Sequence, residues 1–264
     1  MKRAIAVLAM LAAALFITPV RADETVRTLT EQGPNGEFHI SRPVTLSDHA
    51  HPLAVFSVGT NGKPENGRAV FESLASLGIV VIAGTDPDQG EGDQAMLGIE
   101  WLIEQNAVAG SPYYGKLITS RVMAFGLSQG GNAALWTAIR ENRIAANTIT
   151  SVVALAPGAK PEQADTAPVS ELAVPVLYIA GGTDVIVPPA RVRDLYDDNV
   201  SEAWYVVKKG VGHLALLTNQ HVGDVIRAWA MAHLYGDVSA GSEFYGAPWG
   251  LASDDYFRAQ VRNF

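Results

Sequence analysis

The sequence contains no cysteine. This absence excludes disulfide bonds, lipid attachment at a cysteine and thiol chemistry, so the fold has to be stabilised by packing alone. Basic residues are also few, with 19 Lys and Arg against 27 Asp and Glu and a net charge of −8. No basic block interrupts this acidity, and we therefore expect no nucleic-acid partner.

The chain also lacks an apolar run long enough to span a membrane. Ala4–Ile17 is apolar over about 14 residues, whereas a spanning helix needs roughly 20. Lys2 and Arg3 precede this run and the small residue Ala22 follows it, a pattern typical of an export leader. We predict a signal peptide over residues 1–22, with cleavage before Asp23; an N-terminal membrane anchor is the alternative. The mature protein is then secreted or periplasmic, with no stable membrane anchor.

After the leader, apolar runs and turn signals alternate regularly. The pattern predicts strands at 25–30, 37–40, 51–58, 79–83, 121–125, 151–155, 174–180 and 203–207, and helices at 66–77, 93–105, 130–140, 189–196 and 222–234. The first two strands flank a Gly-Pro-Asn-Gly turn and are expected to form a hairpin. Strands that alternate with helices indicate an α/β fold with a mostly parallel central sheet flanked by helices. No linker or repeat divides residues 23–264, so we expect a single domain.

The segment after the last expected helix, residues 236–264, is irregular but rich in aromatic residues. We expect these side chains to pack the tail onto the domain, since aromatic anchors are usually buried. The alternative is that some of them border a substrate cleft. They are Phe244, Tyr245, Trp249, Tyr256, Phe257 and Phe264.

The most specific motif is Gly126-Leu127-Ser128-Gln129-Gly130. It follows an expected strand and precedes an expected helix, where a sharp turn exposes a serine hydroxyl above the sheet. Small residues two positions before and after the serine relieve crowding in this turn. The N-terminus of the following helix favours developing negative charge. Ser128 is therefore the candidate nucleophile; an ordinary glycine-rich turn is the alternative.

A serine nucleophile needs a base, and the base needs an acid to orient it. In this fold the acid and then the histidine follow the serine along the chain. Asp184 follows an expected strand and is the only acid in its loop, and His213 follows the next strand in a Gly-Val-Gly-His sequence. We assign Asp184 as the acid and His213 as the base, with His221 as a distant second.

The tetrahedral intermediate requires hydrogen-bond donors for its oxyanion. One is expected to be the backbone N–H of Gln129, directly after the nucleophile. The other is expected in the loop after the strand at 51–58, where Thr60 is our choice and Asn61 the alternative.

Metal and cofactor motifs are missing. Asp86, Asp88, Glu91 and Asp93 form an acidic loop, but their spacing does not fit the twelve-residue calcium loop. The chain has no phosphate-binding loop or dinucleotide fingerprint. We expect no metal and no cofactor.

The Gly-Leu-Ser-Gln-Gly-Gly, Gly-Gly-Thr-Asp-Val-Ile-Val-Pro and Gly-Val-Gly-His segments resemble those of the cutinase-like and polyester-hydrolase branch of the α/β-hydrolases. They are also similar to chlorophyllases and dienelactone-hydrolase-like esterases. The resemblance covers about residues 52–229 and implies a carboxylic-ester hydrolase that uses Ser128, Asp184 and His213, with oxyanion donors at Thr60 and Gln129.

Three features depart from the family pattern: the residues at two positions, and the absence of the cysteines for a C-terminal disulfide. Polyester hydrolases carry an aromatic residue where this chain has Thr60, and a tryptophan after an Ala-Pro pair where this chain has Gly158. In that family the two aromatics clamp an aromatic acyl group, and a C-terminal disulfide closes the tail. The resemblance therefore implies esterase chemistry more strongly than polymer hydrolysis.

The sequence hypothesis is a secreted serine esterase that acts on short to medium acyl esters, small or polymeric, through an acyl-enzyme. The segment between Pro157 and Val174 is too short for a large lid domain, so an open cleft is expected. A serine peptidase or amidase with the same triad is the first alternative. A catalytically silent exported binding protein is the second.

Overall fold

A computed structural model describes residues 24–33, 36–48, 50–87, 89–144, 148–159 and 165–262, apart from the side chains of residues 260 and 262. The predicted signal peptide and its cleavage site lie outside the described residues. So do the centre of the first turn, His49, Asp88 and Phe264.

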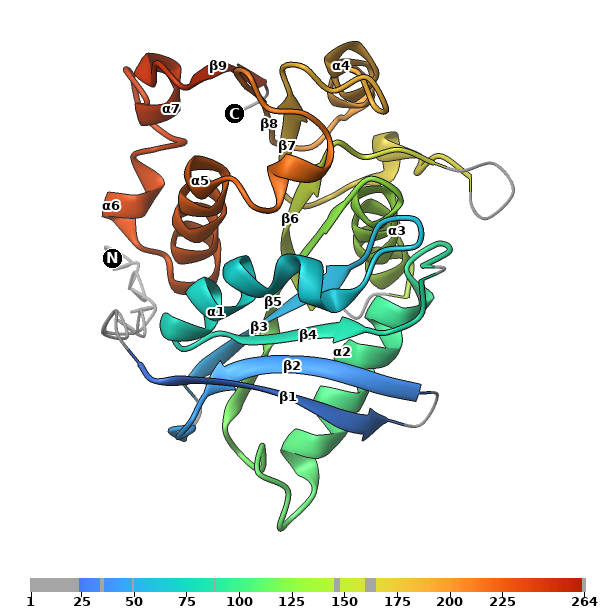
Figure 1. Ribbon diagram of the computed structural model, residues 1–264. Helices are drawn as coiled ribbons and strands as arrows, with labels where there is room; N and C mark the ends of the chain where they lie inside the picture. The colour runs from blue at the N-terminus through green and yellow to red at the C-terminus, as the bar shows by residue number, and fades with distance from the viewer. Residues whose placement is uncertain are drawn as a thin grey trace, which may run out of the picture.

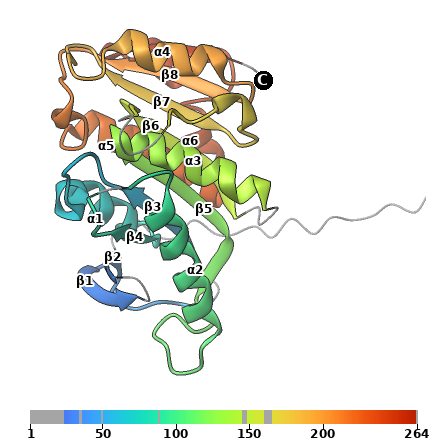
Figure 2. The same ribbon diagram turned by 90° about the vertical axis from the view of Figure 1, so that its right-hand side faces the viewer.

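Within the described residues, nine strands form one sheet in the order β1-β2-β4-β3-β5-β6-β7-β8-β9 (Figures 1 and 2). The six strands from β4 to β8 in this order pair in parallel, as predicted, while β1 and β2 at one edge and β9 at the other are antiparallel. The strands are β1 Val26–Gly33, β2 Gly36–Pro43, β3 His51–Ser57, β4 Val80–Gly84, β5 Leu117–Leu127, β6 Ile149–Leu155, β7 Val176–Gly181, β8 Ala203–Lys208 and β9 Phe257–Arg262.

Helices cover both faces of this sheet (Figures 1 and 2). Helices α1 and α5 pack together on one face, and α2 and α3 pack together on the other. The main helices are α1 Arg68–Ser76, α2 Asp93–Ala107, α3 Gln129–Arg143, α4 Pro189–Asp198 and α5 Gln220–Ala230. Every residue of β3, β4, β7 and β8 is buried, which is the reason these strands appear in the sequence as continuous apolar runs.

Two predicted helix ends differ from the structure in the type of helix that forms there. The first helix begins as a 3₁₀ turn, η1 Pro64–Gly67, because Pro64 has no N–H to donate and suits the start of a helix. The last main helix ends at Ala230 and continues as a π-helical turn, η4 Met231–Tyr235. Two short helices, α6 Val238–Gly241 and α7 Gly250–Ser253, then follow.

Residues 203–207 form a strand, β8, as predicted, but the prediction that this is the last strand of the chain was wrong. Residues Phe257–Arg262 form β9, which pairs antiparallel with β8 from Ala203↔Arg262 to Lys208↔Phe257. An apolar residue at every second position of this segment was the available signal, since a half-buried edge strand alternates in this way. The tail therefore adds an edge strand to the sheet.

The aromatic residues of the tail mostly pack onto the domain, as expected. Phe244 is fully buried, and its carbonyl accepts a hydrogen bond from Nε1 of Trp204 at 2.9 Å. Phe257 is also buried, whereas Tyr256 is exposed. These contacts attach the tail to the domain without a disulfide.

No helix in the described part of the chain is both long and apolar enough to cross a membrane.

Candidate active site

Ser128 occupies the turn between β5 and α3 in a conformation that side chains rarely adopt. Its φ is 61° and its ψ is −125°, and such a backbone costs of order 1–3 kcal/mol. Hydrogen bonds hold it in place: the Ser128 N–H donates to the Leu155 carbonyl at 2.9 Å, and the Ser128 carbonyl accepts from Asn132 and Gly158 at 3.1 Å each. The half-buried serine is thus fixed by contacts with α3 and with the end of β6.

The glycines around Ser128 are required by close backbone contacts. A Cβ on Gly126 would lie 2.2 Å from the Gly130 carbonyl oxygen, and a Cβ on Gly130 would lie 2.0 Å from the Ser57 carbonyl oxygen. A Cβ on Gly131 would lie 2.9 Å from the Leu155 carbonyl oxygen. The steric reason proposed for the Gly-x-Ser-x-Gly pattern therefore holds in this structure.

Asp184 and His213 are brought together from the loops that follow β7 and β8. Nδ1 of His213 lies 2.6 Å from Oδ2 of Asp184, and both side chains are buried. The other carboxylate oxygen, Oδ1, accepts from the N–H groups of Ile186 at 2.8 Å and Val187 at 2.9 Å. These two bonds orient the carboxylate, so that Nδ1 donates to it and Nε2 is left as the proton acceptor of the ring.

The other described histidines make contacts elsewhere. The ring of His221 stacks on Tyr256 with 3.9 Å between centroids, and Nδ1 of His39 lies 3.7 Å from the carboxylate of Glu65. His51 bonds through both nitrogens to backbone groups, and burial lowers its pKa. Of the histidines weighed as the base, His213 is the one that the structure places against Asp184.

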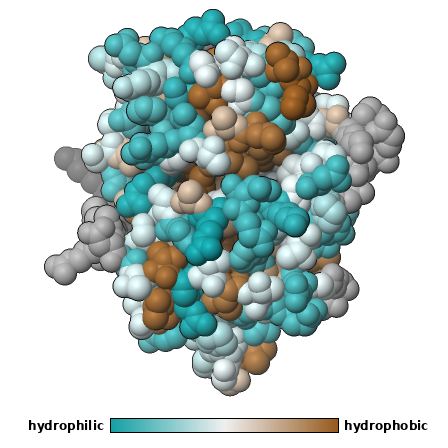
Figure 3. All heavy atoms as spheres, in the orientation of Figure 1, coloured by the Kyte–Doolittle hydropathy of each residue, from teal (hydrophilic) through white to brown (hydrophobic). Residues whose placement is uncertain are grey.

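Ser128 and His213 line one cleft of about 920 Å³, within the range of small-molecule sites. Three loops and the end of β5 form its walls, and the described tail aromatics do not line it. Figure 3, in the orientation of Figure 1, shows exposed hydrophobic residues in the upper half of the molecule, where Figure 1 places the loop after β8. The lining residues are Phe56, Val58–Asn66 without Pro64, Leu127, Ser128, Ile186, His213–Ala215, Leu217 and Thr218.

The two predicted oxyanion residues lie side by side. The hydroxyl of Thr60 donates to Oε1 of Gln129 at 3.1 Å. Gly59 packs so closely that a Cβ there would lie 3.4 Å from Cβ of Ser128. Gln129 directly follows Ser128 and is the first residue of α3, so its backbone N–H belongs to the first turn of that helix. Asn61, the alternative to Thr60, also lines the cleft.

The PETase family, described as PET hydrolase-like, matches residues 68–247. This match spans more than half of the chain and includes Ser128, Asp184 and His213. The chain belongs to the PET hydrolase-like family. The resemblance to polyester hydrolases and the α/β-hydrolase fold are thereby confirmed, and the protein is a hydrolase of esters. No curated protein matched the chain.

This PET hydrolase-like chain departs from the expected aromatic clamp at two positions. Thr60 is exposed and lines the cleft, so a hydroxyl stands where an aromatic ring is expected. Gly158 is not among the described lining residues, and a Cβ there would lie 2.9 Å from Cγ2 of Val187. A larger side chain at this position would therefore have to displace Val187.

The acidic loop before α2 is tied to the protein surface at one end. The carboxylate of Asp93 pairs with Arg140 at 2.6 Å. Asp93 is also in the first turn of α2, where the helix dipole favours a negative charge. The ion pair and the place in the first turn of the helix give Asp93 a structural role.

Apart from Thr60 and Asn61, the sequence interpretation did not identify the residues that form the cleft walls. Ile186 is two residues after Asp184, Leu214 directly follows His213, and Lys63 is four residues after Gly59. Their closeness in sequence to the candidate catalytic residues was the available signal, since loops that carry such residues also build the walls of the site.

Proposed function

We propose that this chain is a serine carboxylic-ester hydrolase that cleaves short to medium acyl esters through an acyl-enzyme. One observation carries the proposal: the buried pair of Asp184 and His213, 2.6 Å apart, faces the same cleft as the strained Ser128. A histidine that is oriented by a carboxylate next to a serine is the arrangement that acyl transfer requires.

In the first half of the reaction, Oγ of Ser128 attacks the ester carbonyl carbon, and its proton passes to Nε2 of His213. The N–H groups of Thr60 and Gln129 bind the resulting oxyanion. Asp184 stabilises the imidazolium, which then donates its proton to the leaving alcohol oxygen as the C–O bond breaks. The products of this half are the alcohol and an ester of Ser128.

In the second half, water replaces the alcohol. His213 accepts a proton from this water, and the remaining hydroxide attacks the acyl carbon of the Ser128 ester. The second tetrahedral intermediate collapses, the proton returns to Oγ of Ser128, and the carboxylic acid leaves. The backbone strain at Ser128 keeps its side chain at the cleft in both halves.

The substrate class follows from family membership and from the cleft. The PET hydrolase-like family supports action on polyesters as well as small esters. Thr60 in place of an aromatic residue favours aliphatic over aromatic acyl groups, because no ring at this position stacks on the substrate. Polymer chains and small esters with aliphatic acids are the substrates that we propose.

The proposed enzyme works outside the cytoplasm. The basic start and apolar run of the leader support export, with cleavage after Ala22 leaving residues 23–264 as one catalytic domain. Loss of the three basic residues of the leader leaves 16 Lys and Arg against 27 Asp and Glu, and a net charge of −11.

A 4-nitrophenyl ester series from acetate to dodecanoate tests the proposal on the protein from Asp23 onward. We expect turnover with a maximum at short or medium acyl chains, and a loss of at least about 10³-fold in Ser128→Ala. The matched control is Ser253→Ala, an exposed serine of α7, which should keep full activity. The absence of wild-type turnover, or equal activity in Ser128→Ala, would contradict the proposal.

A further inference from the structure

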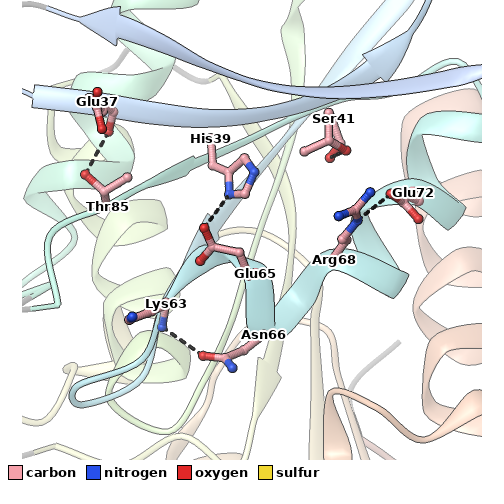
Figure 4. A network of polar contacts seen from close by, with 10 residues as sticks. Glu37, His39, Ser41, Lys63, Glu65, Asn66, Arg68, Glu72 and Thr85 are labelled. Atoms are coloured by element: carbon pink, nitrogen blue, oxygen red, sulfur yellow. Dashed lines mark hydrogen bonds and ion pairs between the residues drawn. The ribbon is translucent and has the colours of Figure 1, made fainter.

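One wall of the cleft is polar and belongs to the segment between β3 and α1. After Gly59 the chain turns back on itself, and the N–H of Gly62 donates to the Gly59 carbonyl at 2.8 Å. This turn brings Lys63, Glu65 and Asn66 to the cleft that Ser128 lines. Figure 4 shows how these three side chains lie.

The hydrogen-bond acceptors of this wall already face groups of the protein. Oδ1 of Asn66 accepts from the backbone N–H of Lys63 at 2.8 Å, which leaves the Nδ2 donor end of the amide for other partners. The carboxylate of Glu65 is turned to His39 on β2, 3.7 Å away (Figure 4). The amide nitrogen Nδ2 of Asn66 is therefore a donor that a ligand can bind.

The ammonium of Lys63 is the cation of this wall. Among the described residues no carboxylate lies within ion-pair distance of it, and Figure 4 shows its side chain pointing away from Glu65. The next cation along the chain, Arg68, is paired with Glu72 at 2.7 Å and does not line the cleft. In a chain with net charge −8, Lys63 is thus a local positive charge in the cleft that the candidate nucleophile lines.

Another part of the cleft lining is apolar. Ile186 and Leu214 line it with 61% and 73% of their surface exposed, together with Ala215 and Leu217. His213 belongs to this wall and has to protonate the leaving oxygen, so the alcohol part of an ester lies along it. With the alcohol part beside His213, the acyl part is left for the side of the cleft formed by the segment after β3, where Lys63 lies.

We propose that the acyl part of the preferred substrate ends in a carboxylate, and that Lys63 is the residue that selects it. The substrate class is then the half-ester of an aliphatic dicarboxylic acid, including the acid-terminated end of a polyester chain. Nδ2 of Asn66 adds a second donor to the carboxylate. This inference rests on the proposed ester hydrolysis and specifies its substrate.

The test compares two chromogenic esters with the same leaving group and the same six-carbon acyl length: 4-nitrophenyl hydrogen adipate, which carries a carboxylate, and 4-nitrophenyl hexanoate, which does not. The quantity measured is the ratio of their kcat/KM values in low salt. In Lys63→Met we expect the ratio to fall about 5-fold through a higher KM for the adipate, the size typical of an exposed ion pair. Hexanoate serves as the reference substrate for each variant, so that any general effect on hydrolysis cancels in the ratio, and added salt should lower the wild-type ratio.

Two control variants separate a specific contact from general charge. Lys63→Arg keeps the cation and should keep the ratio, and Arg68→Met removes a nearby cation outside the cleft and should leave it unchanged. An unchanged ratio in Lys63→Met, with hexanoate still hydrolysed, overturns the role of Lys63 alone. If the wild-type protein hydrolyses neither of the two esters, the esterase function is overturned, and this inference with it.

Discussion

The hydroxyl of Thr60 donates a hydrogen bond to Oε1 of Gln129 at 3.1 Å, joining two segments that are 69 residues apart in sequence. One segment is the loop after β3 and the other is the first turn of α3. Each carries a backbone N–H that we propose as an oxyanion donor. The side chains of these two residues therefore hold the donors of the oxyanion site in a fixed relation.

Replacing Thr60 by Val removes this hydrogen bond and keeps the size of the side chain. We expect kcat for 4-nitrophenyl butyrate to fall about 10-fold, because donors that are less well placed stabilise the oxyanion less, with KM nearly unchanged. Thr60→Ser keeps the hydroxyl and should retain most of the activity. A fall in Thr60→Ser as large as in Thr60→Val would mean that the methyl group matters and the hydrogen bond does not.

Replacing Asp184 by Asn puts an amide next to Nδ1 of His213. If the amide nitrogen faces the ring, His213 has to turn its acceptor to Asp184 and its proton to Ser128, the wrong tautomer for a base. We expect a loss in kcat of about 10³–10⁴-fold. Oδ1 can still accept from Ile186 and Val187, so the unfolding temperature should change little. Activity within a few-fold of wild type would exclude Asp184 as the orienting acid.

The close contact at Gly130 predicts a large cost for a single methyl group. In Gly130→Ala the new Cβ would lie 2.0 Å from the Ser57 carbonyl oxygen, so β3 or the turn has to shift. We expect a loss of more than about 3 kcal/mol in the free energy of unfolding, measured by urea denaturation. Gly223→Ala in α5 is the control: no heavy atom lies within 4 Å of its Cβ, and a gain of about 0.5–1 kcal/mol is expected. Equal stability of the two variants would contradict this account of the turn.

Burial of His233 predicts a loss of stability in mild acid. Its ring lies 4.0 Å from that of Trp229, its Nε2 has no hydrogen-bond partner among the described residues, and burial lowers its pKa to about 4. Because the folded pKa is below the unfolded value, the unfolded state binds more protons between these two values. The contribution is therefore fully present above about pH 6.5 and is lost as the pH falls toward 4.

We expect His233→Phe to lose less stability than the wild type when the pH is lowered from 7 to 4.5, by about 2 kcal/mol at most. Thermal unfolding at several pH values measures this difference. His221→Phe is the control, since this half-buried ring stacks on Tyr256 in the loop region outside the buried cluster of His233, and the variant should follow the wild type. Parallel curves for His233→Phe and the wild type would show that protonation of His233 does not affect folding.

Much of the sheet could be predicted from the sequence because its parallel strands are buried on both faces. β3 and β4 are continuous apolar runs bounded by turn residues, so their positions follow from composition alone. β9 could not be placed with equal ease, because an edge strand depends on its pairing with β8 and carries polar residues at alternate positions. The extra strand shows that the aromatic tail belongs to the sheet.

At the site, local rules were sufficient for the residues held by backbone geometry. The turn at Ser128 needs glycine on both sides, and this requirement is visible in the sequence. The walls of the cleft could not be predicted in the same way, because Lys63 and Leu214 line one cleft only after three loops are brought together. Which groups of a wall remain unpaired, as at Lys63, depends on side-chain contacts that no spacing pattern contains.

Covalent labelling of Ser128 is the most direct test of the central claim. The protein is treated with a small fluorophosphonate, its intact mass is measured, and the modified peptide is sequenced by mass spectrometry. We predict one adduct per chain, on Ser128, with loss of ester hydrolysis in proportion to labelling and with much slower labelling in Asp184→Asn. An unlabelled protein that still hydrolyses esters, or an adduct on another residue, would contradict the account.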